Sequence, residues 1–100
     1  MPRFMIEVDH DDTVASCDAA ARMLLTTGSH FLTHADWGCL DGVHTAWIVV
    51  DVETREQARA IVPPPLRPRA RVVALNGFTL DRIDELVARH GGREAYSSLW

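Results

Sequence analysis

The chain has 100 residues, 47% of them hydrophobic and 24% charged, a composition that suits one globular domain with a single core. Its formal net charge is −4, and its basic residues are all arginines without a cluster, so nucleic acid is not expected as a partner. Apolar runs such as residues 46–50 are much shorter than the roughly 20 residues of a membrane span, and no signal-peptide pattern opens the sequence. We therefore expect a cytoplasmic protein that does not contact a membrane.

The N-terminal part of the sequence predicts a strand followed by a helix. Polar and apolar side chains alternate over residues 3–8, as in a strand with one buried face. His10 and its acidic neighbours favour the start of a helix over residues 13–26, and we interpret His10 as part of that helix cap in preference to a metal ligand. Cys17 lies on the apolar side of this helix, which predicts core packing. Gly28 would end the helix.

The strongest local pattern predicts a β-hairpin. Residues 31–39 and 44–52 are rich in strand-forming residues and flank an Asp-Gly turn pair at residues 41–42. The expected neighbours across a two-residue turn are Asp36 and Trp47, Trp37 and Ala46, Cys39 and His44, and Leu40 and Val43. Because side chains alternate between the faces of a strand, one face would carry His30, Leu32, His34, Asp36, Trp47 and Val49.

The second half of the chain predicts a helix, a strand and another helix. A capping-box pattern at residues 54–57 opens a short helix that the prolines at 63–65 end. A β-branched run at residues 71–75 predicts the last strand. Thr79 is the expected N-cap of a helix over residues 80–90. The side of this helix expected to be buried carries Leu80, Ile83, Leu86 and Val87.

This order of elements predicts an α+β fold of the ferredoxin-like β-α-β-β-α-β type, with an antiparallel sheet plus a C-terminal helix. Residues 1–92 would form this single domain, and residues 93–100 a weakly specified tail. The helices would cover one face of the sheet. The other face would carry an apolar patch of Met5, Leu32, Trp47 and Val49. Monomers rarely expose such a patch, so we expect a homodimer or a higher oligomer in which another copy covers it.

In its order of elements the chain resembles the dimeric α/β-barrel superfamily, in which two such sheets pack face to face around a cavity. That group includes small monooxygenases, muconolactone isomerase-like enzymes, stress-responsive proteins and a nickel-binding protein, so the resemblance implies a fold and a pocket but no single reaction. The segment Thr33 to Cys39, with His44, looks like the signature of a small bacterial subfamily without an assigned activity. No catalytic residue is carried over from it.

Possible metal ligands are concentrated on the predicted hairpin. His30, His34 and Asp36 share strand parity, and Glu7 of the first strand could join them on the same face. Imidazoles and carboxylates suit a divalent metal such as zinc or nickel. The alternative is that His30 is an exposed turn residue, while His34 and Asp36 hydrogen-bond each other or their counterparts in a dimer.

A possible thiol pair lies on the opposite side of the predicted hairpin. Cys39 and His44 would face each other there, either as a polar pair near the turn or as an activated thiolate–imidazole couple. The two cysteines of the chain, Cys17 and Cys39, are too few for a disulfide scaffold. We expect both to be free thiols.

Three classes of function are compatible with these patterns. In the first, a cavity of the dimer, lined by Glu7, His34, Asp36 and Trp47, binds a metal ion or a small polar ligand. In the second, the same cavity belongs to an isomerase-like or monooxygenase-like enzyme in which His34, oriented by Asp36, acts as a general acid or base. In the third, the protein is a structural or regulatory dimer without catalysis. The sequence favours the first.

Overall fold

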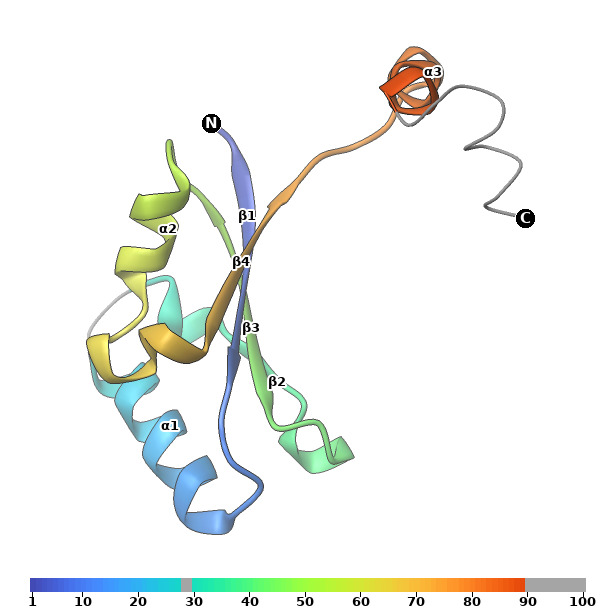
Figure 1. Cartoon of the computed structure of the whole chain (residues 1–100). Coiled ribbons are helices and arrows are strands. Elements are labelled where there is room, and N and C mark those ends of the chain that lie inside the picture. Colours follow the sequence, from blue (N-terminus) through green and yellow to red (C-terminus); the bar gives the residue numbers. More distant parts are fainter. Residues whose placement is uncertain (28–29, 90–100) are drawn as a thin grey trace.

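The computed structural model describes residues 1–27 and 30–89, which form an α+β fold (Figure 1). Its strands and α-helices are β1 (Arg3–Asp9), α1 (Val14–Thr26), β2 (Asp36–Trp37), β3 (Thr45–Asp51), α2 (Arg55–Ile61), β4 (Ala70–Leu75) and α3 (Leu80–Arg89). Short 3₁₀ helices cover Leu32–His34, Cys39–Asp41 and Pro64–Arg69. The strand and helix predicted for the N-terminal part are therefore confirmed.

The four strands form one sheet in the order β2-β3-β1-β4, and every neighbouring pair is antiparallel. The long central strand β1 pairs with β3 on one edge and β4 on the other, so that Glu7 lies between Trp47 and Arg71. This order and these directions are compatible with a ferredoxin-like fold.

The core lies between the sheet and the helices α1 and α2, which both cover the same face of the sheet (Figure 1). Alternate residues of the central strands point into it, and Ile6 and Ile48 are fully buried there, against Leu24 of α1 and Val62 after α2. Burial of each such side chain stabilises the fold by about 1.5–3 kcal/mol. We call the other side of the sheet the open face. It carries Met5, Glu7, Asp36, Trp47, Val49, Arg71, Val73 and Leu75.

Helix starts follow the capping patterns in the sequence. The hydroxyl of Thr13 accepts a hydrogen bond from the amide of Ser16 at 3.0 Å and caps α1. At α2 the side chain of Thr54 accepts from the amide of Gln57, and the Gln57 side chain accepts in return from the Thr54 amide, both at 3.1 Å. The predicted capping box is thus confirmed.

The predicted hairpin is correct in register and wrong in extent. Asp36 pairs with Trp47, and Trp37 with Ala46, as expected. However, β2 has only two residues, because the segments before and after it turn into 3₁₀ helices. Strand alternation therefore does not govern the residues before Asp36. Leu32, predicted on the open face, is buried in the core instead.

The two-residue turn is replaced by a longer loop built around Gly38. The amides of Asp41 and Val43 both donate to the Gly38 carbonyl, at 3.0 and 2.9 Å, which coils the chain where a flat hairpin was expected. Gly42 closes the 3₁₀ helix with a φ of 81°, a left-handed conformation that glycine adopts without strain. Cys39 and His44 therefore do not face each other across a ladder.

The C-terminal helix is present as predicted, but its surroundings differ. The apolar side chains expected to be buried are exposed, with 81% exposure for Leu80, 37% for Ile83 and 40% for Leu86. None of the described residues of α3 is buried, and Val87 is half-buried. The expected helix stop at Gly28, the end of the last helix at His90 and the tail over residues 93–100 lie outside the described residues.

Candidate metal centre

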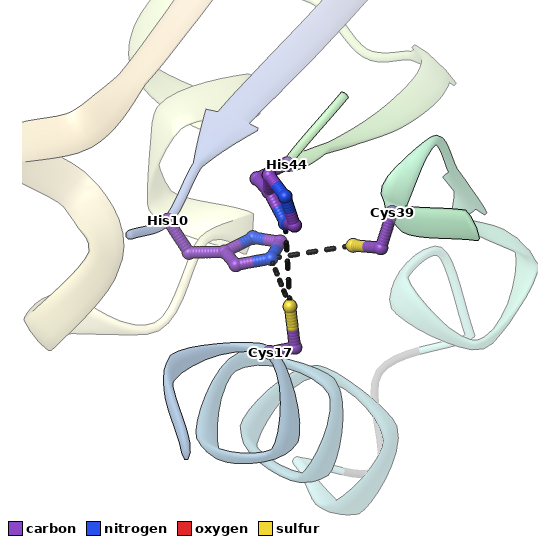
Figure 2. Close-up of side chains that lie close together, drawn as sticks. All are labelled: His10, Cys17, Cys39 and His44. Atoms are coloured by element: carbon purple, nitrogen blue, oxygen red, sulfur yellow. Dashed lines mark hydrogen bonds between the residues drawn. The ribbon is translucent and has the colours of Figure 1, made fainter. Parts of the chain in front are cut away.

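Two histidines and two cysteines from four separate segments meet at one end of the sheet (Figure 2). His10 follows β1, Cys17 lies in the first turns of α1, Cys39 opens a 3₁₀ helix, and His44 precedes β3. One possible ligand atom from each residue lies within 4.8 Å of the corresponding atoms of the other three. We call these four residues the Cys2His2 cluster. Among the described residues it is the only group of three or more His, Cys, Asp or Glu side chains that converges in this way.

Backbone hydrogen bonds place the two histidines side by side. The amide of His10 donates to the carbonyl of His44 at 3.1 Å, which continues the pairing of β1 with β3 by one residue beyond the ladder. On the helix, the amide of Cys17 donates to the carbonyl of Thr13 at 3.0 Å. Because Thr13 also caps the helix, the position of Cys17 is set by the start of α1.

The loop that carries Cys39 is held against the sheet by a close approach at Gly38. The Gly38 amide donates to the carbonyl of Thr45 at 3.1 Å. A Cβ atom on Gly38 would lie 2.8 Å from the Val43 carbonyl oxygen and 2.9 Å from the Trp47 ring. Only glycine therefore allows this approach, which brings Cys39 and His44 to the same point.

The distances within the cluster suit one small ion. His10 Nε2 lies 3.1 Å from Cys17 Sγ and 3.2 Å from Cys39 Sγ, and His44 Nδ1 lies 3.4 Å from Cys17 Sγ. Around a tetrahedral zinc ion, sulfur and nitrogen ligands are separated by about 3.3–3.8 Å. The four ligand atoms therefore need only small adjustments to surround a metal, and the cluster could hold one.

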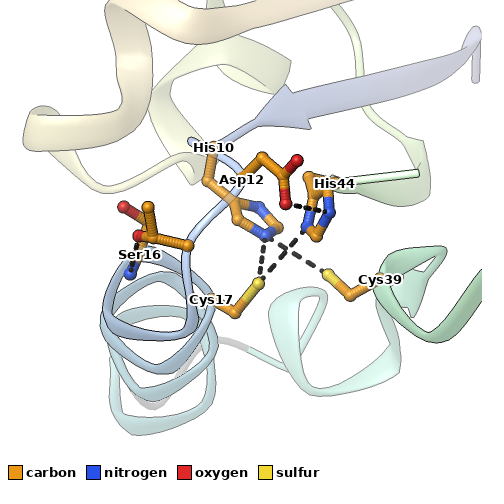
Figure 3. A network of polar contacts seen from close by, with 7 residues as sticks. His10, Asp12, Ser16, Cys17, Cys39 and His44 are labelled. Atoms are coloured by element: carbon orange, nitrogen blue, oxygen red, sulfur yellow. Dashed lines mark hydrogen bonds and ion pairs between the residues drawn. The ribbon is translucent and has the colours of Figure 1, made fainter. Parts of the chain in front are cut away.

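Asp12 fixes the orientation of one of the histidines (Figure 3). Its Oδ1 lies 2.9 Å from His44 Nε2. If the ring of His44 is neutral and its proton is on Nε2, Nε2 donates a hydrogen bond to the carboxylate. Nδ1 then presents its lone pair to the cluster. Metal-binding histidines commonly have such a carboxylate partner, which sets the tautomer and raises the basicity of the ligating nitrogen.

His10 is buried with one nitrogen inside the cluster and the other without a partner. The residue is 7% exposed, and no described residue forms a hydrogen bond with Nδ1. The ring lies beside Trp37, with the centroids 6.0 Å apart. Burial of a polar ring is costly unless its polar atoms are satisfied, and the hydrogen bonds of the described His10 ring are those of Nε2 with the two sulfurs.

The surroundings of the cluster disfavour charge on two of its members, His10 and Cys17. Burial lowers the pKa of His10, and the nearby His44 and Arg69 add to that effect, while Asp11 and Asp9 oppose it. Burial also raises the pKa of the Cys17 thiol, with further contributions from its hydrogen bond to Cys39 and from the charges of Cys39 and Asp12. A divalent cation bound in the cluster would reverse this preference at Cys17, because a coordinating thiol is deprotonated.

The residues predicted from sequence as metal ligands lie elsewhere. The rings of His30 and His34 are near each other, with centroids 4.8 Å apart, and together with Asp51 they line a shallow surface hollow. Asp36 is exposed on β2. None of His30, His34 and Asp36 belongs to the Cys2His2 cluster, so a metal site formed by these three stays a prediction.

The predicted ligand pocket is only partly assembled in one chain. On the open face, the indole Nε1 of Trp47 donates to Glu7 Oε1 at 3.3 Å, so these two residues are in contact. The imidazole of His34 contacts the Thr33 hydroxyl at 3.1 Å. A pocket or catalytic role for His34 and Asp36 therefore also stays a prediction.

The pairing of Cys39 with His44 is the sequence inference that comes nearest to the cluster. The structure brings both to one point, together with His10 and Cys17. The interpretation of His10 as a helix cap was wrong, since Thr13 caps α1, and Cys17 is half-buried beside polar groups and not in the apolar core. The signal that could have found them is the antiparallel pairing of β1 with β3, which puts the residue after one strand beside the residue before the other.

Comparison of the chain with protein-family models, with curated proteins and with solved structures finds no match. In the described part of the chain, none of the helices has the length and apolar character needed to cross a membrane. The function is therefore argued from the geometry of the cluster.

Proposed function

We propose that this protein binds one zinc ion per chain through His10, Cys17, Cys39 and His44. The observation that carries the proposal is the convergence of four ligand side chains from four separate segments within 4.8 Å. A tetrahedral set of two sulfurs and two nitrogens is typical of zinc, whereas nickel prefers other geometries. The two thiolates would neutralise the ion, which suits a half-buried site.

The role proposed for the zinc ion is structural. All four positions of a tetrahedral ion would be filled by protein side chains, which is typical of structural sites, whereas catalytic zinc keeps one position for water or substrate. The ion would join the end of β1, the start of α1 and the β2–β3 connection. These segments are otherwise joined at this end by a few hydrogen bonds, among them the one from His10 to His44.

For the architecture, we infer a ferredoxin-like domain that forms a homodimer. The antiparallel sheet, with its strand order and with α1 and α2 on one face, supports the domain assignment. The apolar side chains on the open face support the dimer.

The test is metal content, measured by mass spectrometry on protein purified without an affinity tag. We expect close to one zinc per chain in the wild type and almost none in Cys39→Ser. His34→Ala is the matched control, because it removes an exposed imidazole outside the cluster, and it should keep its zinc. Zinc lost in His34→Ala but kept in Cys39→Ser would overturn the proposal.

Cobalt substitution tests the ligand set independently. Co²⁺ bound by two thiolates and two imidazoles in a tetrahedron gives intense visible bands and a sulfur-to-cobalt charge-transfer band in the near ultraviolet. We expect both in the wild type. Weak bands typical of six oxygen and nitrogen ligands would contradict the assignment of Cys17 and Cys39 as ligands.

A further inference from the structure

The open face of the sheet carries apolar side chains that the described part of the chain leaves partly exposed. Val49 is 51% exposed and Leu75 is 38% exposed, and Met5, Trp47 and Val73 between them are half-buried. The helices α1 and α2 lie on the other side of the sheet (Figure 1). A patch of this kind on a sheet is typical of a contact surface.

Helix α3 also exposes apolar side chains. Leu80, Ile83, Leu86 and Val87 recur at helical spacing and form an apolar stripe, and the preceding Phe78 is 58% exposed. A helix of ten residues is only marginally stable in water by itself, so the stripe must pack against something for the helix to persist.

The connection to α3 leads away from the chain's own sheet. β4 ends at Leu75, opposite Arg3, and the exposed residues 76–79 carry the chain outward, so that α3 lies apart from the sheet (Figure 1). The helix is capped in this position: the hydroxyl of Thr79 accepts from the amide of Arg82 at 3.3 Å, and its carbonyl accepts from the amide of Ile83 at 3.1 Å.

We propose that two copies of this chain exchange α3, so that the apolar stripe of each helix packs on the open face of the other copy. Each chain supplies one helix and one face, so a twofold axis satisfies both and closes the assembly. Face-to-face packing of two sheets alone, the arrangement expected from sequence, would leave the stripe on α3 exposed.

The size and charge of the two surfaces are consistent with this exchange. Covering the exposed apolar side chains of both helices and both faces would bury on the order of 1,000 Å², where stable interfaces begin. By helical spacing the stripe is bordered by Arg82 on one side and Asp84 on the other. The open face likewise carries charges of both signs, with Glu7 paired to Arg71 near its centre and Arg3 paired to Asp51 at its end, so neither surface carries a block of one charge.

Photo-crosslinking between isotopically distinct chains tests the exchange directly. A benzophenone amino acid replaces Leu86, and ¹⁴N and ¹⁵N chains are refolded together with zinc before irradiation. We expect crosslinks from α3 to peptides that contain Met5, Trp47 or Val49, about half of them joining a ¹⁴N to a ¹⁵N chain. Crosslinks confined to one isotope would show that α3 covers its own sheet and would overturn the proposal. The same photoreactive group at Glu85, on the polar side of α3, should not reach the sheet.

Sedimentation of single variants provides the second test. Ile83→Glu and Val49→Glu should each change the wild-type dimer to a monomer, whereas Glu85→Gln should remain a dimer. A monomeric wild type, or an Ile83→Glu variant that stays dimeric while Val49→Glu dissociates, would overturn the exchange. Zinc content is measured in parallel and should be unchanged in all three, so failure of the dimer is distinguishable from failure of the metal site.

Discussion

The two ends of the central strand β1 differ in how far the side chains around them find contacts within a single chain. Beyond Asp9, the Cys2His2 cluster joins four segments of one chain, and each ligand contacts at least one other. At the other end, beside Arg3, the chain leaves the sheet toward α3 and keeps its apolar stripe exposed. This difference motivates the two proposals, an ion at one end of β1 and a second copy of the chain at the other.

Removal of the metal should have the largest effect on the free energy of unfolding. The loss should come from the Cys2His2 cluster. We expect chelation of the wild type, or Cys39→Ser, to reduce the free energy of unfolding by at least about 3 kcal/mol, since binding to a structural zinc site is folding free energy. For a domain of this size, that corresponds to a fall in Tm of more than about 10 °C. Thermal unfolding followed by circular dichroism measures it. Chelator should add nothing to Cys39→Ser, and a further fall there would place the essential metal elsewhere.

Gly38→Ala should damage the cluster without changing a ligand. The new Cβ would meet the backbone oxygen of Val43 at 2.8 Å, so the loop that carries Cys39 and His44 must shift. We expect a loss of about 1–3 kcal/mol, as for other overpacked sites, together with weaker zinc binding. Denaturant unfolding and a competitive zinc titration measure the two effects.

Gly77→Ala is the control for that substitution at the opposite end of β1. A Cβ on Gly77 meets nothing within 4 Å. It should therefore leave zinc affinity unchanged. Equal effects of the two alanines on zinc binding would show that the packing at Gly38 does not position the cluster.

Asp12→Asn should weaken zinc binding more gently. The amide keeps the size of the side chain but removes the negative charge from the contact with His44 Nε2. Loss of such a partner typically reduces metal affinity by about 10–100-fold. Competition with a chromophoric chelator measures it. Asp18→Asn, which removes a carboxylate paired with Arg22 on exposed helix surface, should leave the affinity unchanged.

The smallest effect is expected from a substitution at the start of α3. Thr79→Ala removes the cap of α3, which typically costs about 0.5–2 kcal/mol of helix stability. We expect a several-fold higher dissociation constant of the dimer in sedimentation and no change in zinc content. A change in zinc content would mean that the two ends of β1 are coupled.

The sequence predicted the elements whose cause is local. The alternation in β1 and the capping box at Thr54 depend on neighbouring residues, and both are confirmed. The register of Trp37 with Ala46 also follows from local pattern. The length of β2 does not, because it is limited by a carbonyl at Gly38 that accepts two amides at once.

The cluster was missed because each of its members has an ordinary local explanation. His10 beside acidic residues suits a helix cap, and Cys17 on an apolar helix side suits core packing. Only the pairing of β1 with β3 shows that His10 and His44 are neighbours. The burial predicted for α3 was wrong for a related reason, because an apolar stripe predicts burial but does not identify the surface that provides it.

The position of the four ligands along the chain has a consequence for the order of folding. His10 and His44 are the first and last of the four residues in the sequence, so every proposed ligand precedes β3, and the proposed ion would close its loops without β4 or α3. Synthesis proceeds from the N-terminus, so all four proposed ligands are made before β4 and α3. The proposed dimer, which depends on the last described helix, would then form from subunits that already hold the proposed ion.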